Sequence, residues 1–168
     1  WATTSTQLPK TSARVLKSTS EATGLKIRSH VLTYQTEAGP QFIDITDNVV
    51  QLVQQSGVEN GFVVVFSKHT TAAIAINENE PHLIADMVEM IERLLPKGHE
   101  YAHNAFAHSL NNGEPPNGHS HCQHLLLGSS ETVPLLDGHL TFGQWQRIFL
   151  VELDDSRERE VVVQIVGE

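Results

Sequence analysis

The sequence predicts an α+β domain built on a largely antiparallel β-sheet. Short apolar runs rich in β-branched residues alternate with turns, helical segments interrupt them, and the last part of the chain has the pattern of consecutive hairpins. A parallel arrangement would instead alternate strands and crossover helices regularly along the chain. The order of elements therefore favours antiparallel pairing.

Apolar runs that are too short for helices predict the strands. They are rich in Val and Ile, and several alternate apolar with polar residues. In the first half of the chain they cover residues 25–36, 41–46, 61–68 and 71–79. In the second half, Asp137-Gly138 is a strong signal for a tight hairpin, and residues 154–156 are predicted to join a second hairpin of segments 144–153 and 157–168.

Three helices are predicted from apolar residues at helical spacing and from signals at the helix ends. The first covers residues 47–57, with its cap at Asp44 or Thr46. The second begins with Pro81 in its first turn and ends before Pro96. A short third helix is predicted over the end of the histidine-rich segment.

A single domain over residues 25–168 is predicted, preceded by an extended N-terminal arm over residues 1–24. A chain of 168 residues suits one domain with a real core. Residues 98–118 are polar and irregular, and loops of this length in a compact domain tend to be functional or disordered. The length and polarity of this loop indicate a lid over a site, and such a lid favours an enzyme.

The overall charge excludes two classes of partner. The chain carries a net charge of −9 with its histidines neutral, so it should repel nucleic-acid backbones and anionic membranes. Cys122 is the only cysteine, so no internal disulfide and no oxidising compartment is required. No apolar run approaches the roughly 20 residues of a spanning helix. We expect a cytoplasmic protein.

His69, Thr70 and Thr71 follow a buried strand and form the first candidate site. Two hydroxyl groups and the nearby backbone N–H groups can hold an anion such as phosphate. Asn77 and Glu78 close the next strand, and they reach His69 only if the chain folds back suitably. The alternative is a polar strand end followed by a helix cap.

Asp86 is the second candidate. It is the one acid in the N-terminal half of an otherwise apolar helix, four residues after His82. It is either a solvated acid favoured by the helix dipole, or a buried general base that can also orient a metal-bound histidine.

Six of the ten histidines fall between residues 99 and 124. His119 and His121 can chelate one metal on an extended backbone, whereas on a helix they point about 200° apart and His121 instead faces His124. Two such ligands with His69 would make three and leave one position open, which is the pattern of catalytic zinc. The alternative is a loop with scattered histidines. A lone Cys such as Cys122 is usually just buried.

The remaining candidates lie in the last third of the chain. Trp145 is expected in the core or against another subunit, and Gln146 and Arg147 point to opposite faces of a strand. Arg157 and Arg159 either anchor an anionic substrate or form a charged hairpin tip. The common nucleotide, hydrolase and redox motifs are missing from the sequence.

The stretches "HTTAAIAINENE", "NGHSHCQHLLLGSSETVPLLDGHLTFGQWQRIFLVEL" and the closing "VVVQIVGE", with Asp86 between the first two, together resemble the YjbQ family of secondary thiamine-phosphate synthases. The likeness runs from about Leu25 to Glu168. Gln144 stands where the family usually has threonine. The family signature otherwise matches at Ser130, Val133, Leu135, Gly138, Gly143, Trp145 and Gln146.

The resemblance implies an α+β fold on an antiparallel sheet, assembled as a cyclic trimer. Its His-x-His motif matches His119 and His121, which with His69 are the expected ligands of a zinc-like metal, whereas the family does not usually reserve the position of His124 for histidine. His103 matches the family's loop histidine only loosely. The resemblance implies a site near subunit boundaries, made from His69, Asn77, Glu78, Asp86, His119 and His121.

The family activity joins a hydroxymethylpyrimidine diphosphate to a thiazole phosphate and releases pyrophosphate. It needs phosphate-binding groups, a divalent cation such as magnesium on the diphosphate, and stabilisation of a pyrimidine cation. The residues expected to bind phosphate or substrate are Thr70, Thr71, Ser129, Ser130 and Gln146.

Two functional hypotheses follow. One is a metal-assisted enzyme, a transferase or a hydrolase, acting on a small phosphorylated substrate. The other is a non-catalytic trimeric protein that binds a metal or an anion. Few Lys or Arg residues surround the expected site, which fits poorly with an efficient diphosphate enzyme.

Overall fold

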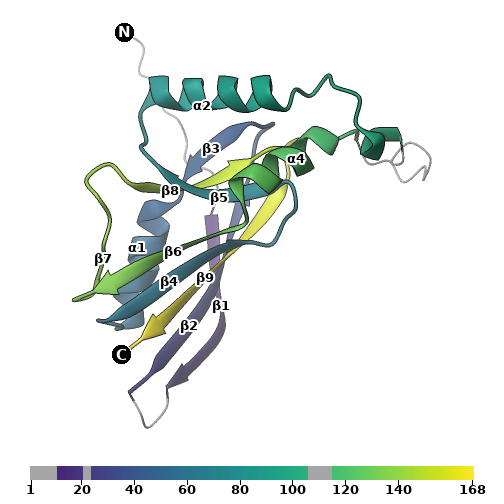
Figure 1. Cartoon of the computed structure of the whole chain (residues 1–168). Coiled ribbons are helices and arrows are strands. Elements are labelled where there is room, and N and C mark those ends of the chain that lie inside the picture. The colour runs from purple at the N-terminus through teal and green to yellow at the C-terminus, as the bar shows by residue number, and fades with distance from the viewer. Residues whose placement is uncertain (1–10, 21–23, 106–114) are drawn as a thin grey trace.

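Two antiparallel sheets and the helices packed on them make up the described part of the chain (Figure 1). The computed structural model describes residues 11–20, 24–105 and 115–168. Parts of the predicted arm and of the predicted loop, including His108, lie outside the described residues. The predicted α+β class with antiparallel pairing is confirmed.

The larger sheet has six strands in the order β1-β2-β9-β4-β6-β7. Its strands are Thr11–Ser20 (β1), Lys26–Gln35 (β2), Gly61–Ser67 (β4), Ser130–Leu136 (β6), His139–Leu140 (β7) and Glu158–Gly167 (β9). Residues 11–20 of the predicted arm form the edge strand of this sheet. The predicted hairpin at Asp137-Gly138 is confirmed, and both residues have positive φ, 49° and 75°, as such a turn requires.

The smaller sheet has three strands in the order β3-β8-β5. They are Gln41–Asp44 (β3), Arg147–Glu152 (β8) and Ala72–Asn77 (β5). Both faces of β8 are buried: Ile148 and Leu150 belong to the main core, whereas Phe149 and Val151 belong to a second core on the other face. This double burial explains the unbroken apolar run in its sequence.

The helices cover the small sheet and complete the main core. Helix α1 (Thr46–Ser56) contributes Val49, Leu52 and Val53 to the main core. Helices α2 (Pro81–Leu94) and α4 (Gly118–Leu127) contact the second core (Figure 1). All three predicted helices are confirmed. None of the helices in the described ranges is long and apolar enough to cross a membrane.

Two details at α1 and β8 differ from the predictions. The residue before α1 is Ile45, and Asp44 supports the first turn by accepting a hydrogen bond from the Thr46 N–H at 3.0 Å. The predicted hairpin of segments 144–153 and 157–168 is wrong, because β8 pairs with β3 and β5 while β9 pairs with β2 and β4. A strand buried on both faces needs a central place in a covered sheet, which the local turn signal does not reveal.

A buried ion pair links β8 of the small sheet to β9 of the large sheet, where the chain passes from one sheet to the other. Arg159 in β9 donates from Nε and Nη2 to the two carboxylate oxygens of Glu152 at the end of β8, both at 2.6 Å. The two residues are 4% and 0% exposed. Glu152 also accepts from the Thr36 hydroxyl at 2.8 Å and from the N–H groups of Leu153 and Asp154. The carboxylate is therefore fully hydrogen-bonded, as a buried charge requires.

Removing one partner of this pair should be far more damaging than removing both. Breaking a buried pair leaves an uncompensated charge and costs about 3–5 kcal/mol, whereas apolar replacements of both partners are often tolerated. We expect Arg159→Met to lower the free energy of unfolding by about 3–5 kcal/mol, and the double variant Glu152→Leu/Arg159→Met to be more stable than Arg159→Met alone. Urea unfolding measures both.

The matched control is Arg93→Met on the exposed side of α2, which should change the free energy of unfolding by less than about 0.5 kcal/mol. An Arg159→Met chain as stable as this control would show that the pair does not hold the two sheets together.

Candidate functional site

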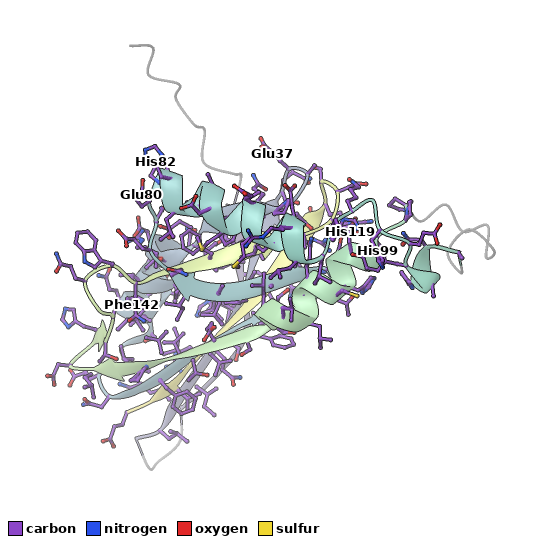
Figure 2. The ribbon with its side chains drawn as sticks, turned by 45° about the horizontal axis from the view of Figure 1, so that its top comes forward. Glu37, Glu80, His82, His99, His119 and Phe142 are labelled. Carbon is purple, nitrogen blue, oxygen red and sulfur yellow. The ribbon has the colours of Figure 1, made fainter. Side chains whose placement is uncertain are left out.

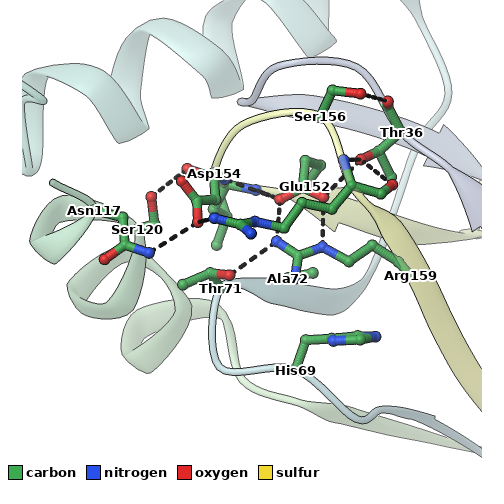
Figure 3. A network of polar contacts seen from close by, with 12 residues as sticks. Thr36, His69, Thr71, Ala72, Asn117, Ser120, Glu152, Asp154, Ser156 and Arg159 are labelled. Atoms are coloured by element: carbon green, nitrogen blue, oxygen red, sulfur yellow. Dashed lines mark hydrogen bonds and ion pairs between the residues drawn. The ribbon is translucent and has the colours of Figure 1, made fainter. Parts of the chain in front are cut away.

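Three segments meet at one corner of the molecule: the turn between β4 and β5, the connection between β8 and β9, and the start of α4 (Figure 3). Leu153 joins them, because its N–H donates to the Thr71 carbonyl at 3.1 Å and its own carbonyl accepts from the Ser120 hydroxyl at 2.6 Å. Arg159 adds a further link, donating to the Thr71 hydroxyl at 2.8 Å. Thr71 is thus a buried part of this network, while Thr70 beside it is exposed.

His69 lies in the β4–β5 turn beside Arg159 (Figure 3). The Glu160 N–H donates to its Nε2 at 2.8 Å, so the Nε2 lone pair is occupied. Burial, and then the charge of Arg159, lower the pKa of His69. A neutral imidazole has one N–H, which must therefore sit on Nδ1. His69 is held as a hydrogen-bond donor with its Nε2 unavailable.

His119, in the first turn of α4, has the opposite arrangement. Its Nε2 is 3.2 Å from the Ser120 hydroxyl, whose single hydrogen already goes to the Leu153 carbonyl. Nε2 must therefore carry the proton and donate to Ser120, which leaves Nδ1 as an acceptor. Burial is the main cause that lowers the pKa of His119. His119 is only 6% exposed.

Asp154 links this corner to the residue before α4. Its Oδ2 accepts from Asn117 Nδ2 at 2.9 Å and from Arg157 Nη2 at 3.0 Å. Burial alone would raise the pKa of Asp154, but these hydrogen bonds outweigh it and the pKa is lowered. Asp154 is therefore a structural anion that orients Asn117. Arg159 belongs to the buried network and not to a charged hairpin tip.

The segment before α4 packs against the start of that helix. The Gly118 N–H donates to Asn104 Oδ1 at 2.9 Å, and a Cβ at Gly118 would collide with Tyr101. The centroid of the Tyr101 ring lies 5.1 Å from that of His99 and 6.4 Å from that of His119. Tyr101 therefore packs beside the start of α4.

The structure places three predicted partners of His69 away from the turn that carries it: Asn77, Glu78 and Asp86. Asn77 ends β5, the strand that begins just after the His69 turn, and Asp86 is exposed on α2. Figure 2 shows Glu80 and His82, at the start of α2, far along that helix from His99 and His119. Within one chain these acids do not meet His69.

Glu78 instead lines a separate pocket of about 360 Å³. Arg147 lies in this pocket and pairs with Asp44 at 2.7 Å, and Trp145, 62% exposed, forms another wall. Trp145 is therefore not in the core of the chain. The lining residues are Asp44, Glu78, Asn79, Glu80, Gln144, Trp145 and Arg147.

The remaining predicted phosphate ligands are dispersed. The Ser129 hydroxyl contacts His124 Nε2 at 3.1 Å, so His124 has a partner of its own. Ser130 is exposed at the start of β6. Gln146 accepts the Gly143 N–H at 2.9 Å through its side chain and closes the turn that carries Trp145.

The three predicted metal ligands do not fit a zinc site within one chain. His69 already accepts a hydrogen bond at Nε2, and His119 and His121 lie on a helix, where their side chains diverge. In residues 11–20, 24–105 and 115–168, no three or more His, Cys, Asp or Glu side chains gather in a way that could hold a metal ion. A metal at these histidines stays a prediction of the family resemblance.

Four residues of the corner were missed in the sequence: Asn117, Ser120, Glu152 and Asp154. One signal was available for Glu152, because it is the only charged residue in the otherwise apolar run from Ile148 to Leu153 and therefore had to be buried with a partner. Nothing local distinguishes Asn117 or Ser120 from ordinary polar residues at a helix start.

Comparison with known proteins agrees with this architecture. Residues 30–168 match the family described as UPF0047 protein YjbQ-like. A UPF0047 protein of Methanothermobacter thermautotrophicus is 38% identical over 143 residues, which cover 85% of this chain and 94% of that protein. The UPF0047 protein YugU of Bacillus subtilis is 31% identical over 81% of this chain and 97% of its own length.

Solved structures of similar proteins have the same fold. A YbjQ-like protein of unknown function from Sulfolobus solfataricus superposes with a TM-score of 0.71 at 36% identity, over 84% of this chain and 99% of that one. An uncharacterised YjbQ/UPF0047 protein from Clostridium acetobutylicum gives a TM-score of 0.67 at 37% identity, over 78% and 96% of the two chains. The chain belongs to the YjbQ/UPF0047 family.

Proposed function

We propose that the chain is an enzyme that acts on a small phosphorylated substrate at the corner formed by His69, Arg159 and the start of α4. The observation that carries this proposal is the hydrogen bond from the Glu160 N–H to His69 Nε2. It fixes a neutral ring whose Nδ1–H is a donor. Such a donor can stabilise negative charge on a phosphoryl oxygen without first losing a proton.

His119 supplies the complementary group. Its Nδ1 is a buried acceptor without a partner in the described part of the chain, so it can accept a proton once a substrate reaches it. Two histidines whose surroundings set opposite tautomers are suited to acid and base roles in one reaction. Nearby Lys68 and Thr70 are exposed and can contact further phosphate oxygens, although Lys68 also forms an ion pair with Glu160.

The synthase reaction expected from the family resemblance is one candidate for this site. The bond between the pyrimidine methylene carbon and the diphosphate oxygen breaks, pyrophosphate leaves, and the thiazole nitrogen forms a new bond to that carbon. In this proposal the His69 Nδ1–H stabilises the departing diphosphate. Magnesium enters only as the companion of the diphosphate substrate, and no step requires a metal at the histidines.

A homotrimer is also part of the proposal, and it would place further residues at the site. Its support is the family resemblance together with large apolar side chains that one chain leaves exposed, namely Trp145 at 62%, Leu126 at 66% and Leu125 at 82%. Exposed apolar groups of this size are typical of protein contacts. Glu78 and Asp86 reach the His69 corner only if a second chain supplies them.

Pyrophosphate binding tests the role of His69. A hydrogen bond to a charged group contributes about 1.5–3 kcal/mol, so we expect His69→Ala to weaken the binding of pyrophosphate by about 10-fold or more. Calorimetry with and without magnesium measures this. His69→Asn, which keeps an amide N–H near the Nδ1 position, should retain more affinity than His69→Gln. Thr132→Ala, at an exposed position of β6, is the control.

A wild-type protein that binds no pyrophosphate under either condition would refute the proposed function. Equal binding by the wild type and His69→Ala would refute the role of His69.

The pH dependence of stability tests whether both rings are neutral. The pKa values of His69 and His119 are lowered from the ordinary 6.5, so the unfolded chain takes up protons first as the pH falls. We expect the free energy of unfolding to decline between pH 7 and pH 5, and to decline less steeply in His119→Leu. Urea unfolding at several pH values measures this. A wild-type chain that is equally or more stable at pH 5 would contradict the neutral rings.

Light scattering tests the trimer. The wild type is expected to have three times the mass of one chain at micromolar concentration, and Leu126→Asp should shift the protein towards single chains because it places a charge in an apolar contact. Thr132→Asp is the control. A single-chain mass for the wild type would remove the trimer from the proposal.

A further inference from the structure

A small pocket lies between the ends of α2 and α4. It has a volume of about 40 Å³, and its walls are apolar side chains of both helices, such as Ile91 and Leu127. Three further residues that line this α2–α4 pocket are large, apolar and yet exposed: Met90 at 43%, Leu94 at 57% and Leu126 at 66%. Exposed apolar side chains that gather around a hollow are typical of a protein contact.

Gln123 is the one polar residue among the described residues that line the pocket. Its side chain is 2% exposed, and its Nε2 donates to the carbonyl of Leu95, the residue after α2, at 2.9 Å. A carbonyl oxygen only accepts, so the amide nitrogen must face Leu95 and the orientation of the amide is fixed. The other amide atom, Oε1, is buried and has no hydrogen-bond partner within the described ranges. Such a buried acceptor is rare and requires a donor.

These features describe the group that would fill the pocket. Apolar walls favour an apolar body, and Oε1 can accept one hydrogen bond from an N–H or O–H at its tip. A water molecule fits poorly, because a buried water needs about two to four polar partners and this wall supplies one. The side chain of tryptophan meets both requirements, since it has a large apolar ring and a single N–H that only donates.

Trp145 is a tryptophan with this donor available. Its side chain is 62% exposed, and no described residue accepts a hydrogen bond from its indole N–H. Trp145 lies beside Glu80, which precedes α2, whereas the α2–α4 pocket lies at the other end of that helix. A helix of 14 residues, at about 1.5 Å per residue, separates the two places by about 20 Å. A Trp145 that fills this pocket therefore comes from another copy of the chain.

We propose that Trp145 of one copy inserts into the α2–α4 pocket of the next copy and donates its indole N–H to Gln123 Oε1. The inference rests on the homotrimer of the proposed function and gives that assembly a specific contact. Because the donor and the pocket lie at different places on the surface, the contact is head-to-tail, and head-to-tail contacts close into rings when the rotation allows. In a closed ring of three, every pocket is filled and every Trp145 is covered.

Crosslinking between chains tests the contact directly. In the full-length chain with Cys122→Ser, the double variant Leu94→Cys/Gln144→Cys places one thiol at the rim of the pocket and the other beside Trp145. The two positions are about 20 Å apart within one chain, so a short bismaleimide joins them only between copies. We expect chains linked into dimers and trimers on a denaturing gel. The matched control moves the first thiol to Gln55, exposed on α1, and should give single chains.

Light scattering over a dilution series measures how much the anchor contributes. We expect Trp145→Ala to raise the concentration at which the trimer dissociates by about 10-fold or more, because buried aromatic anchors commonly carry that much of an interface's affinity. Trp145→Phe keeps a ring but lacks the donor, so it should fall between Trp145→Ala and the wild type. Leu25→Ala, which truncates an exposed apolar side chain just before β2, is the control and should dissociate like the wild type.

Double-cysteine chains that link no better than the Gln55 control would overturn the inference. A Trp145→Ala chain that assembles as tightly as the wild type would overturn it as well. If the wild type still has the mass of three chains in either case, the trimer stands and only this contact fails. A single-chain mass for the wild type would refute the contact and the trimer together, whereas pyrophosphate binding tests the His69 site independently of both.

Discussion

The buried ion pair between Glu152 and Arg159 joins β8 of the small sheet to β9 of the large one. It lies where the chain leaves the small sheet for the large one, and its carboxylate also binds Thr36 and two backbone N–H groups. A charge buried this deeply is tolerated only when every lone pair is satisfied. The pair therefore sets the path of residues 153–158, and through Leu153 and Thr71 it sets where α4 and the His69 turn can lie.

The positions of the candidate site residues follow from the hydrogen-bond network at that corner and not from any one sequence motif. His69 Nε2 accepts a hydrogen bond from the N–H of Glu160, the residue after Arg159. His119 Nε2 donates to the Ser120 hydroxyl, which in turn donates to the Leu153 carbonyl. Backbone groups of the same connection thus fix two imidazoles in opposite tautomers. A histidine pair prepared in this way can donate to one part of a substrate and accept from another without rearranging protons first.

The sequence predicted the local elements better than their arrangement. Strand β4, helix α2 with Pro81 and the turn at Asp137-Gly138 each carry a local signal strong enough to decide the structure. The connection from β8 to β9 carries no such local signal, because a hairpin and a change of sheet require the same turn residues. For the site, His69 and His119 were found from their residue type. Their partners Glu160 and Ser120 contribute through a backbone N–H and a hydroxyl, which no spacing rule identifies.

The corner holds His69 and His119 as neutral rings with opposite tautomers. Long-range ¹H–¹⁵N correlation spectra of protein labelled with ¹⁵N-histidine report the protonation of each ring nitrogen directly. At pH 7.5 we expect the proton of His69 on Nδ1 and that of His119 on Nε2, with both assignments lost in Arg159→Met. The same tautomer in both rings, or a doubly protonated ring in either residue, would refute this arrangement.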